Sequence, residues 1–261
     1  MVLAAPQHQS PIVTWEKLPE DFILPDDPVE NIQQPSLAAA LTDALGATNR
    51  IQPHMLVATN FGIVANINQK TVVKAPDWLY FPRVSPVGTG VIRRSYTPNT
   101  EGENVAVVME FLSDTDNAEY SIRPTFPYGK LYFYERILQV PTYVIFNPYE
   151  VTLEVRHLEN GQYVLQQPSE SGHFWIRELD LFLGIWQGTR LGLNIYWLRW
   201  WDQEGNLLLW SSEQVEQERQ RAEQERQRAD NAIAQLEVER RRQEALAAKL
   251  RQLGIDPDVE S

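Results

Sequence analysis

The sequence VVMEFLS, residues 107–113, places a glutamate inside a stretch that is otherwise typical of a buried β-strand. Side chains alternate between the faces of a strand, giving one set with Val107, Met109 and Phe111 and another with Val108, Glu110 and Leu112. Both faces are otherwise apolar, which is typical of a central strand covered by other layers on both sides. An unpaired buried carboxylate costs several kcal/mol, so the fold must supply Glu110 with a compensating partner.

The composition bounds the class of protein. The 261 residues are 43% hydrophobic and 22% charged, which is ordinary for a globular protein large enough to bury a core. The absence of cysteine excludes disulfides, thiolate catalysis and cysteine-based zinc sites. No apolar run reaches the roughly 20 residues of a membrane span, and the start lacks the features of a secretory signal. We therefore expect a cytoplasmic protein with no membrane partner.

The net charge of −12 shows no general basic footprint for nucleic acid. This counts against a protein that coats DNA without specificity. It leaves open an enzyme that binds DNA through a local groove and a metal ion.

The first part of the chain is expected to hold one helix. Residues 1–14 have no apolar periodicity and are predicted to be disordered, and prolines punctuate the following segment. Ser36 is a predicted N-cap for a helix from Leu37 to Leu45.

From Met55 the chain is predicted to be mainly β. The segment VVKAPDWLYF (72–81) is expected to form a strand that contains Asp77, with Pro76 at an edge or bulge. The strand that contains Glu110 is expected at 105–112, a helix at 129–139 and a further strand at 142–146. Asn160-Gly161 predicts a tight hairpin, and later segments add antiparallel strands. The predicted fold class is α/β, a mixed sheet flanked by helices.

Six of the eight tryptophans lie between residues 175 and 210. The simpler interpretation is that they cover the sheet. The alternative is that some of them stack on bases of nucleic acid.

The composition changes after Trp210, and residues 211–255 are predicted to form a charged helix. EQERQRA occurs twice in tandem, and a seven-residue register persists, with one position occupied by Val215, Ala222, Ala229, Leu236 and Leu250 and broken by Gln243. The next apolar position is occupied by Ala232, Leu246 and Leu253, but also by Glu218, Glu225 and Glu239. A self-associating coiled coil, which would make the protein a homo-oligomer such as a dimer, and a solvated single helix are both compatible with this pattern. Residues 256–261 are predicted to be a disordered tail.

Three residues are candidates for chemistry. Asp77 and Glu110 are carboxylates within apolar segments. With 100° per residue, Lys130 falls within the apolar arc of the 129–139 helix, so it either extends toward solvent or points at a buried anion. Mg²⁺ takes hard oxygen ligands and often only one or two protein carboxylates, and a nearby lysine can stabilise charge on a phosphate. A structural ion pair is the alternative.

The motifs A-P-D-W-L-Y-F, V-M-E-F-L-S, G-K-L-Y-F-Y and V-P-T-Y-V-I-F-N-P together resemble the Uma-two endonuclease family, in the form common in cyanobacteria with a C-terminal coiled coil. The resemblance covers most of residues 15–210. It implies a restriction-endonuclease-like fold of the PD-(D/E)xK superfamily. By this resemblance Asp77 and Glu110 are metal ligands, and Lys130 completes the catalytic set.

The chain departs from the general PD-(D/E)xK pattern at one position. Leu112 stands two residues after Glu110, where that pattern has lysine, so the lysine must come from the following helix. An acidic residue from the first helix often completes such sites, and Glu30 is the best candidate, although a solvated loop position is equally compatible with the sequence.

Two functions are predicted. The first is a Mg²⁺- or Mn²⁺-dependent endonuclease that acts on DNA, with Asp77, Glu110 and Lys130 as catalytic residues and Asp77, Glu110 and Glu30 as metal ligands. The alternative is an inactive interaction or scaffold protein that keeps the nuclease fold and assembles through its C-terminal helix.

Overall fold

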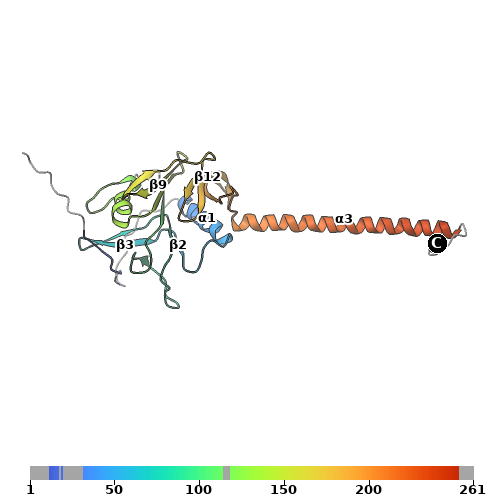
Figure 1. Cartoon of the computed structure of the whole chain (residues 1–261), viewed down its shortest axis with the longest axis horizontal. Helices are drawn as coiled ribbons and strands as arrows, with labels where there is room; N and C mark the ends of the chain where they lie inside the picture. Colours follow the sequence, from blue (N-terminus) through green and yellow to red (C-terminus); the bar gives the residue numbers. More distant parts are fainter. Residues whose placement is uncertain (1–11, 18, 20–31, 114–117, 253–261) are drawn as a thin grey trace, which may run out of the picture. The chain divides into compact units, whose positions relative to one another are not determined.

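The computed structural model of the chain describes residues 12–17, 19, 32–113 and 118–252. The chain divides into two compact units, residues 1–210 and 211–261. The strands of the described residues all belong to the first unit, and the second contains the helix α3 (Ser211–Gln252), which runs without interruption (Figure 1). Most of segment 1–14, Glu30 and all of segment 256–261 lie outside the described residues, whereas Val13–Thr14 form strand β1.

The first unit is built on a six-stranded sheet with the order β10-β9-β8-β7-β5-β2. Its strands β7 and β8 are parallel and every other pair in it is antiparallel. The sheet is therefore mixed, and the predicted α/β class is confirmed. The strands are β2 (Leu56–Ala58), β5 (Trp78–Phe81), β7 (Val107–Phe111), β8 (Thr142–Asn147), β9 (Thr152–Glu159) and β10 (Gln162–Leu165).

Two smaller sheets complete the strands of this unit. One joins β1 and β6 (Ser95–Tyr96) to β3 (Gly62–Ile67), which also pairs with β4 (Lys70–Lys74). The other is antiparallel and contains β11 (Phe174–Ile176), β12 (Leu181–Arg190) and β13 (Leu193–Trp201). The predicted antiparallel C-terminal strands are thus confirmed.

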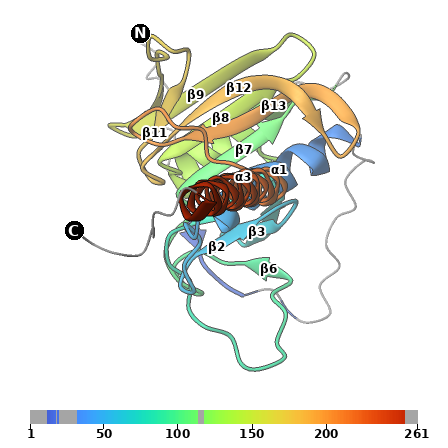
Figure 2. The ribbon, with the colours of Figure 1, turned by 90° about the vertical axis from the view of Figure 1, so that its right-hand side faces the viewer.

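Strand β7 is covered on both faces, as its sequence predicts. Val107, Met109 and Phe111 belong to a buried cluster that includes residues of helix α1 (Gln33–Ala47) and of β12 and β13. Figures 1 and 2 show α1 and the β12–β13 hairpin close together. Val108 belongs to a second cluster, with side chains from β3 and from the helical segment 130–138. Glu110 shares the Val108 face, so the carboxylate points toward that helical segment.

The helical segment that faces β7 begins as α2 (Lys130–Tyr132) and continues as the π-helix η2 (Phe133–Leu138). Its limits agree with the helix predicted at 129–139. Gln139 ends it in the left-handed conformation, with φ of 52°. A short 3₁₀ helix, η1 (Ala118–Tyr120), precedes it.

Two local predictions were wrong for reasons that involve proline. Helix α1 begins at Gln33 rather than after Ser36, since Pro35 lies in the first turn, where its missing N–H is not needed. Ser36 Oγ instead donates to Ile32 O at 2.8 Å from within the helix. Segment 72–81 is not one strand: β4 and β5 belong to different sheets, and Asp77 precedes β5.

The Asn160-Gly161 hairpin and the tryptophan layer agree with the predictions. Asn160 and Gly161 have φ of 49° and 76°, as a type I′ turn requires, and they join β9 to β10. The indole N–H groups of Trp200 and Trp210 donate to α1 carbonyls, those of Leu41 and Ala40. Both tryptophans are buried, so they pack the core and are not available for base stacking.

Candidate active site

Glu110 on β7 is 1% exposed and has a partner for each carboxylate oxygen. Its Oε1 accepts a hydrogen bond from the Tyr134 hydroxyl at 2.8 Å. Its Oε2 lies 3.2 Å from the Lys130 ammonium. Both partners come from the helical segment 130–138, which the fold holds against this face of the sheet. These two contacts compensate a carboxylate that would otherwise be costly in an apolar strand.

Lys130, the first residue of α2, lies between two acidic side chains. Besides Glu110, it contacts Glu119 Oε1 at 3.1 Å, and its own side chain is 24% exposed. The other oxygen of Glu119, Oε2, is buried and has no hydrogen-bond partner among the described residues. Glu119 comes from η1, and its backbone carbonyl accepts a hydrogen bond from Tyr143 at 3.0 Å. One cation therefore serves two buried carboxylates.

Asp77 lies at the start of β5, directly beside the end of β7. The antiparallel register pairs Trp78 with Met109, so it carries Asp77 to the position opposite Glu110. The half-buried Asp77 side chain accepts a hydrogen bond from the backbone N–H of Phe111 at 2.5 Å. On the other side of this peptide segment, Gln34 Nε2 donates to Phe111 O at 2.7 Å. The register therefore places the two carboxylates side by side, Asp77 just before β5 and Glu110 near the end of β7.

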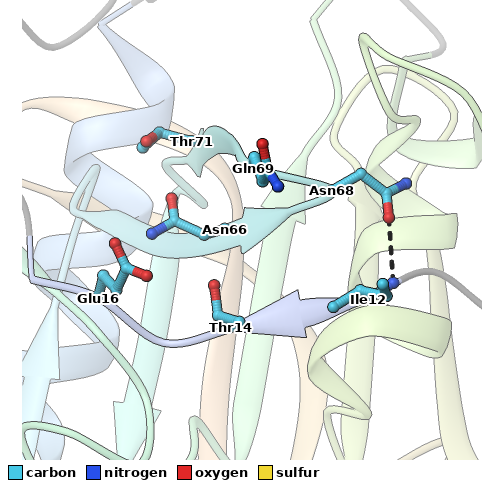
Figure 3. A pocket seen from close by; sticks show the side chains of 7 residues that line it. All are labelled: Ile12, Thr14, Glu16, Asn66, Asn68, Gln69 and Thr71. Atoms are coloured by element: carbon cyan, nitrogen blue, oxygen red, sulfur yellow. Dashed lines mark hydrogen bonds between the residues drawn. The ribbon is translucent and has the colours of Figure 1, made fainter.

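A pocket of about 180 Å³ opens beside Asp77. It is lined by residues of α1 and of the loop before β3, namely Gln34, Pro35, Ala38, Ala39, Thr59 and Asn60. A larger pocket, of about 680 Å³, lies on the sheet formed by β1, β3 and β4 (Figure 3). Its lining is mainly polar, with Thr14, Asn66, Thr71 and Glu16, and it does not include Asp77, Glu110 or Lys130.

Burial and neighbouring charges shift the pKa values of three groups in this cluster. Burial raises the pKa of Glu110, while the nearby Lys130 charge and the Tyr134 hydrogen bond act in the opposite direction. Burial alone would lower the pKa of Lys130, but the negative charges of Glu110 and Glu119 outweigh it and raise that pKa. Burial, followed by the Glu110 charge, raises the pKa of Tyr134 well above its usual range, so this hydroxyl remains a donor.

The site contains three residues to which the sequence prediction gave no role: Glu119, Tyr134 and Gln34. Tyr134 lies four residues after Lys130, a spacing that places both on one helix face, and this signal was available. Glu119 lies in an irregular segment without periodicity, and only the tertiary fold brings it to Lys130. Gln34 was hidden because the start of α1 was predicted too late.

The donor set suits a hard divalent cation, although it is small. Asp77 and Glu110 offer carboxylate oxygens, and one or two carboxylates plus water are typical for Mg²⁺. Within the part of the chain that the structure describes, no three His, Asp or Glu side chains are grouped as a metal site. Glu30, the predicted third ligand, lies outside the described residues.

The mixed sheet with its helices is the fold class that was expected for a restriction-endonuclease-like chain. The family model Uma2, described as "Putative restriction endonuclease", matches residues 17–195. The chain belongs to this family, and the family points to a nuclease that acts on DNA. A comparison with curated proteins found no match. In the described residues, no helix combines the length and apolar character needed to cross a membrane.

Proposed function

We propose that this chain is a Mg²⁺- or Mn²⁺-dependent endonuclease that hydrolyses DNA phosphodiester bonds. Asp77 and Glu110 would hold the metal ion, and Lys130 would assist the attack of water. The observation that carries the proposal is that these three side chains lie near one another. Lys130 Nζ lies 3.2 Å from Glu110, and Asp77 lies opposite Glu110 in the strand register.

Each residue has a role that its contacts support. Lys130 remains protonated between two carboxylates, so its ammonium can orient water and stabilise negative charge on the phosphate. Tyr134 holds one oxygen of Glu110, which fixes the carboxylate rotamer. A bound divalent ion would supply an activated water and neutralise charge on the phosphate. Glu30 remains the proposed third ligand.

DNA binding would have to rest on local cations, because the net charge is −12. Of the arginines near the site in the sequence, Arg93 is held by Glu101 at 2.9 Å and its side chain is 12% exposed. Arg83 is 67% exposed and its contact with Glu103 is 3.5 Å long, so Arg83 is better suited to reach a phosphate.

Plasmid nicking tests the proposal. The full chain is incubated with supercoiled DNA and Mn²⁺ or Mg²⁺, alongside Asp77→Asn and Lys130→Ala, and an EDTA sample shows the metal requirement. Lys17→Ala is the matched control, since Lys17 is 69% exposed and its ion pair with Glu101 is 3.8 Å long. We expect nicking by the parent and Lys17→Ala only. Equal nicking by all four proteins would refute the assignment.

A second candidate is an inactive protein that keeps this fold and assembles through its C-terminal helix, with a homodimer as the proposed state. The observation in its favour is the 42-residue helix α3, which buries none of its described residues. Calorimetric titration with Mn²⁺ separates the two. A clear isotherm that Glu110→Gln abolishes contradicts the inactive protein, and the absence of binding contradicts the nuclease.

A further inference from the structure

Helix α3 carries a stripe of apolar side chains that nothing in its own unit covers. In heptad register, position a is occupied by Val215, Ala222, Ala229, Leu236 and Leu250, and Gln243 interrupts this apolar series. The apolar side chains of this helix are open to solvent: Leu236 is 71% exposed and Leu246, at position d, is 59% exposed. A long helix with an exposed stripe of period seven fits a partner helix.

The seam also contains glutamates, and each is followed by an arginine. Position d is occupied by Glu218, Glu225 and Glu239, and position e by Arg219, Arg226 and Arg240. Within α3 these arginines contact acids on the outer face, Glu216 at 3.1 Å, Asp230 at 3.9 Å and Glu244 at 3.5 Å. In contrast, the side chains of the three seam glutamates form no hydrogen bond or ion pair with any described residue.

We propose that α3 pairs with α3 of a second copy of this chain as a parallel, in-register coiled coil. In such a pair, a d side chain packs beside the e side chain of the partner helix. Each seam glutamate faces its own copy across the d layer, and the arginine of the second copy that lies beside it offsets this like-charge contact. Position a faces position a, so Val215, Ala222, Ala229 and Leu236 each meet an identical apolar side chain.

The antiparallel arrangement loses both advantages, because position a then faces position d of the partner. An alignment that joins Val215 with Leu246 also places Leu236 opposite Glu225 and Ala222 opposite Glu239. These contacts set carboxylates against apolar side chains without the matching arginines. Polar residues at seam positions set register and orientation at some cost in stability, which is the role that we assign to the three glutamates.

Parallel pairing has a consequence for the first unit. Because Ser211 follows Trp210 directly in the chain, both copies of the first unit are attached at the same end of the coiled coil. Two candidate sites would then be available together, as cleavage of both strands of a duplex requires. This consequence rests on the proposed nuclease function, whereas the pairing of α3 does not.

Disulfide trapping tests the orientation. The chain contains no cysteine, so a single introduced thiol reports one position. Ala222→Cys in the full chain should give a covalent dimer on mild oxidation, because identical a positions face each other. Gln220→Cys, on the outer face, is the matched control and should give little. The proposal is overturned if the Ala222→Cys variant does not cross-link to itself but does cross-link when it is mixed with the Glu239→Cys variant. It is also overturned if light scattering finds the parent monomeric at every concentration.

A charge swap tests the glutamate–arginine layers, with dimer dissociation measured by sedimentation equilibrium. Glu225→Arg should raise the dissociation constant about tenfold, because it replaces attraction by repulsion in one layer. Adding Arg226→Glu to the same chain should restore the constant to within about threefold of the parent value. Circular dichroism checks that each variant keeps its helix. If the second substitution does not restore dimerisation, the proposed contact between Glu225 and Arg226 of the second copy is refuted. Plasmid cleavage is not used, so inactive sites would not affect either result.

Discussion

Replacement of Lys130 by Met tests the electrostatic balance around Glu110. Methionine keeps a long unbranched side chain but has no charge. In the parent chain Lys130 Nζ lies 3.2 Å from Glu110 and 3.1 Å from Glu119, so the variant leaves two carboxylates without their cation. Removal of one partner from a buried ion pair costs about 3–5 kcal/mol of stability.

In the Lys130→Met variant, protonation of Glu110 sets an upper limit to the loss of stability that this residue causes, because a neutral carboxyl needs no cation. Starting from the ordinary pKa of 4.5, protonation costs about 1.4 kcal/mol for each pH unit above that value. The limit is about 5 kcal/mol at pH 8 and about 1.4 kcal/mol at pH 5.5. A raised folded pKa means that the folded state holds more protons than the unfolded one, so the variant must lose stability as pH rises.

Urea unfolding in EDTA at both pH values provides the measurement. All eight tryptophans lie at or before Trp210, so their fluorescence reports the first unit. We expect a loss of stability of about 3–5 kcal/mol at pH 8 and a clearly smaller loss at pH 5.5, where protonation limits the share of Glu110 to about 1.4 kcal/mol. The double variant Lys130→Met with Glu110→Gln is the control and should show a much weaker pH dependence. A loss below about 1 kcal/mol at pH 8, or an equal loss at both pH values, would refute this reasoning.

Three further predictions concern other parts of the first unit. Burial lowers the pKa of His157 and of His173 from 6.5, so the parent should lose stability as pH falls below 6.5, where the unfolded chain binds protons more readily. His157→Gln should show a smaller loss than the parent in denaturant unfolding at pH 5–7. Gly129→Ala should cost about 1–3 kcal/mol in the same assay, because the new Cβ would lie 2.1 Å from the backbone oxygen of Ser121. Gly161→Ala should cost only about 1 kcal/mol, because its φ of 76° is unfavourable but the space around it is open; an equal cost at both glycines would contradict this distinction.

The meeting of Glu110 and Lys130 could be predicted from sequence because both rest on simple periodicities. Alternation assigns Glu110 to a face, and the helical wheel turns Lys130 inward. Only 19 residues lie between Glu110 and Lys130, so few chain topologies would place the strand and the helix far apart. The position of Asp77 was predicted less well, since a strand boundary at Pro76 cannot be located from apolar pattern alone. Its register opposite Glu110 depends on the pairing of β5 with β7.

Glu119 could not have been predicted by the same means. It lies in a segment with no periodicity, and its approach to Lys130 requires the close backbone contact that Gly129 permits. The Tyr132 N–H donates to Ser121 O at 3.3 Å, which joins the segment after η1 to the helix that bears Lys130. Such a contact depends on the packing of two loops and leaves no local pattern in the sequence.

The sequence left open whether Asp77, Glu110 and Lys130 are a structural ion pair or a metal site, and the balance of charge favours the second interpretation. A structural pair needs one acid for one base, and Lys130 with Glu110 would satisfy it. Among the described residues, this part of the sheet brings three carboxylates, those of Asp77, Glu110 and Glu119, near Lys130, and the negative charges of all three raise the pKa of Lys130. One buried oxygen of Glu119 also has no partner among the described residues. An excess of acid over base in this part of the sheet is unfavourable for the protein alone, and a bound cation would offset it. The glutamate in VVMEFLS is thus compensated in part by Lys130 and Tyr134, and the remaining negative charge is what supports a divalent ion as the proposed cofactor.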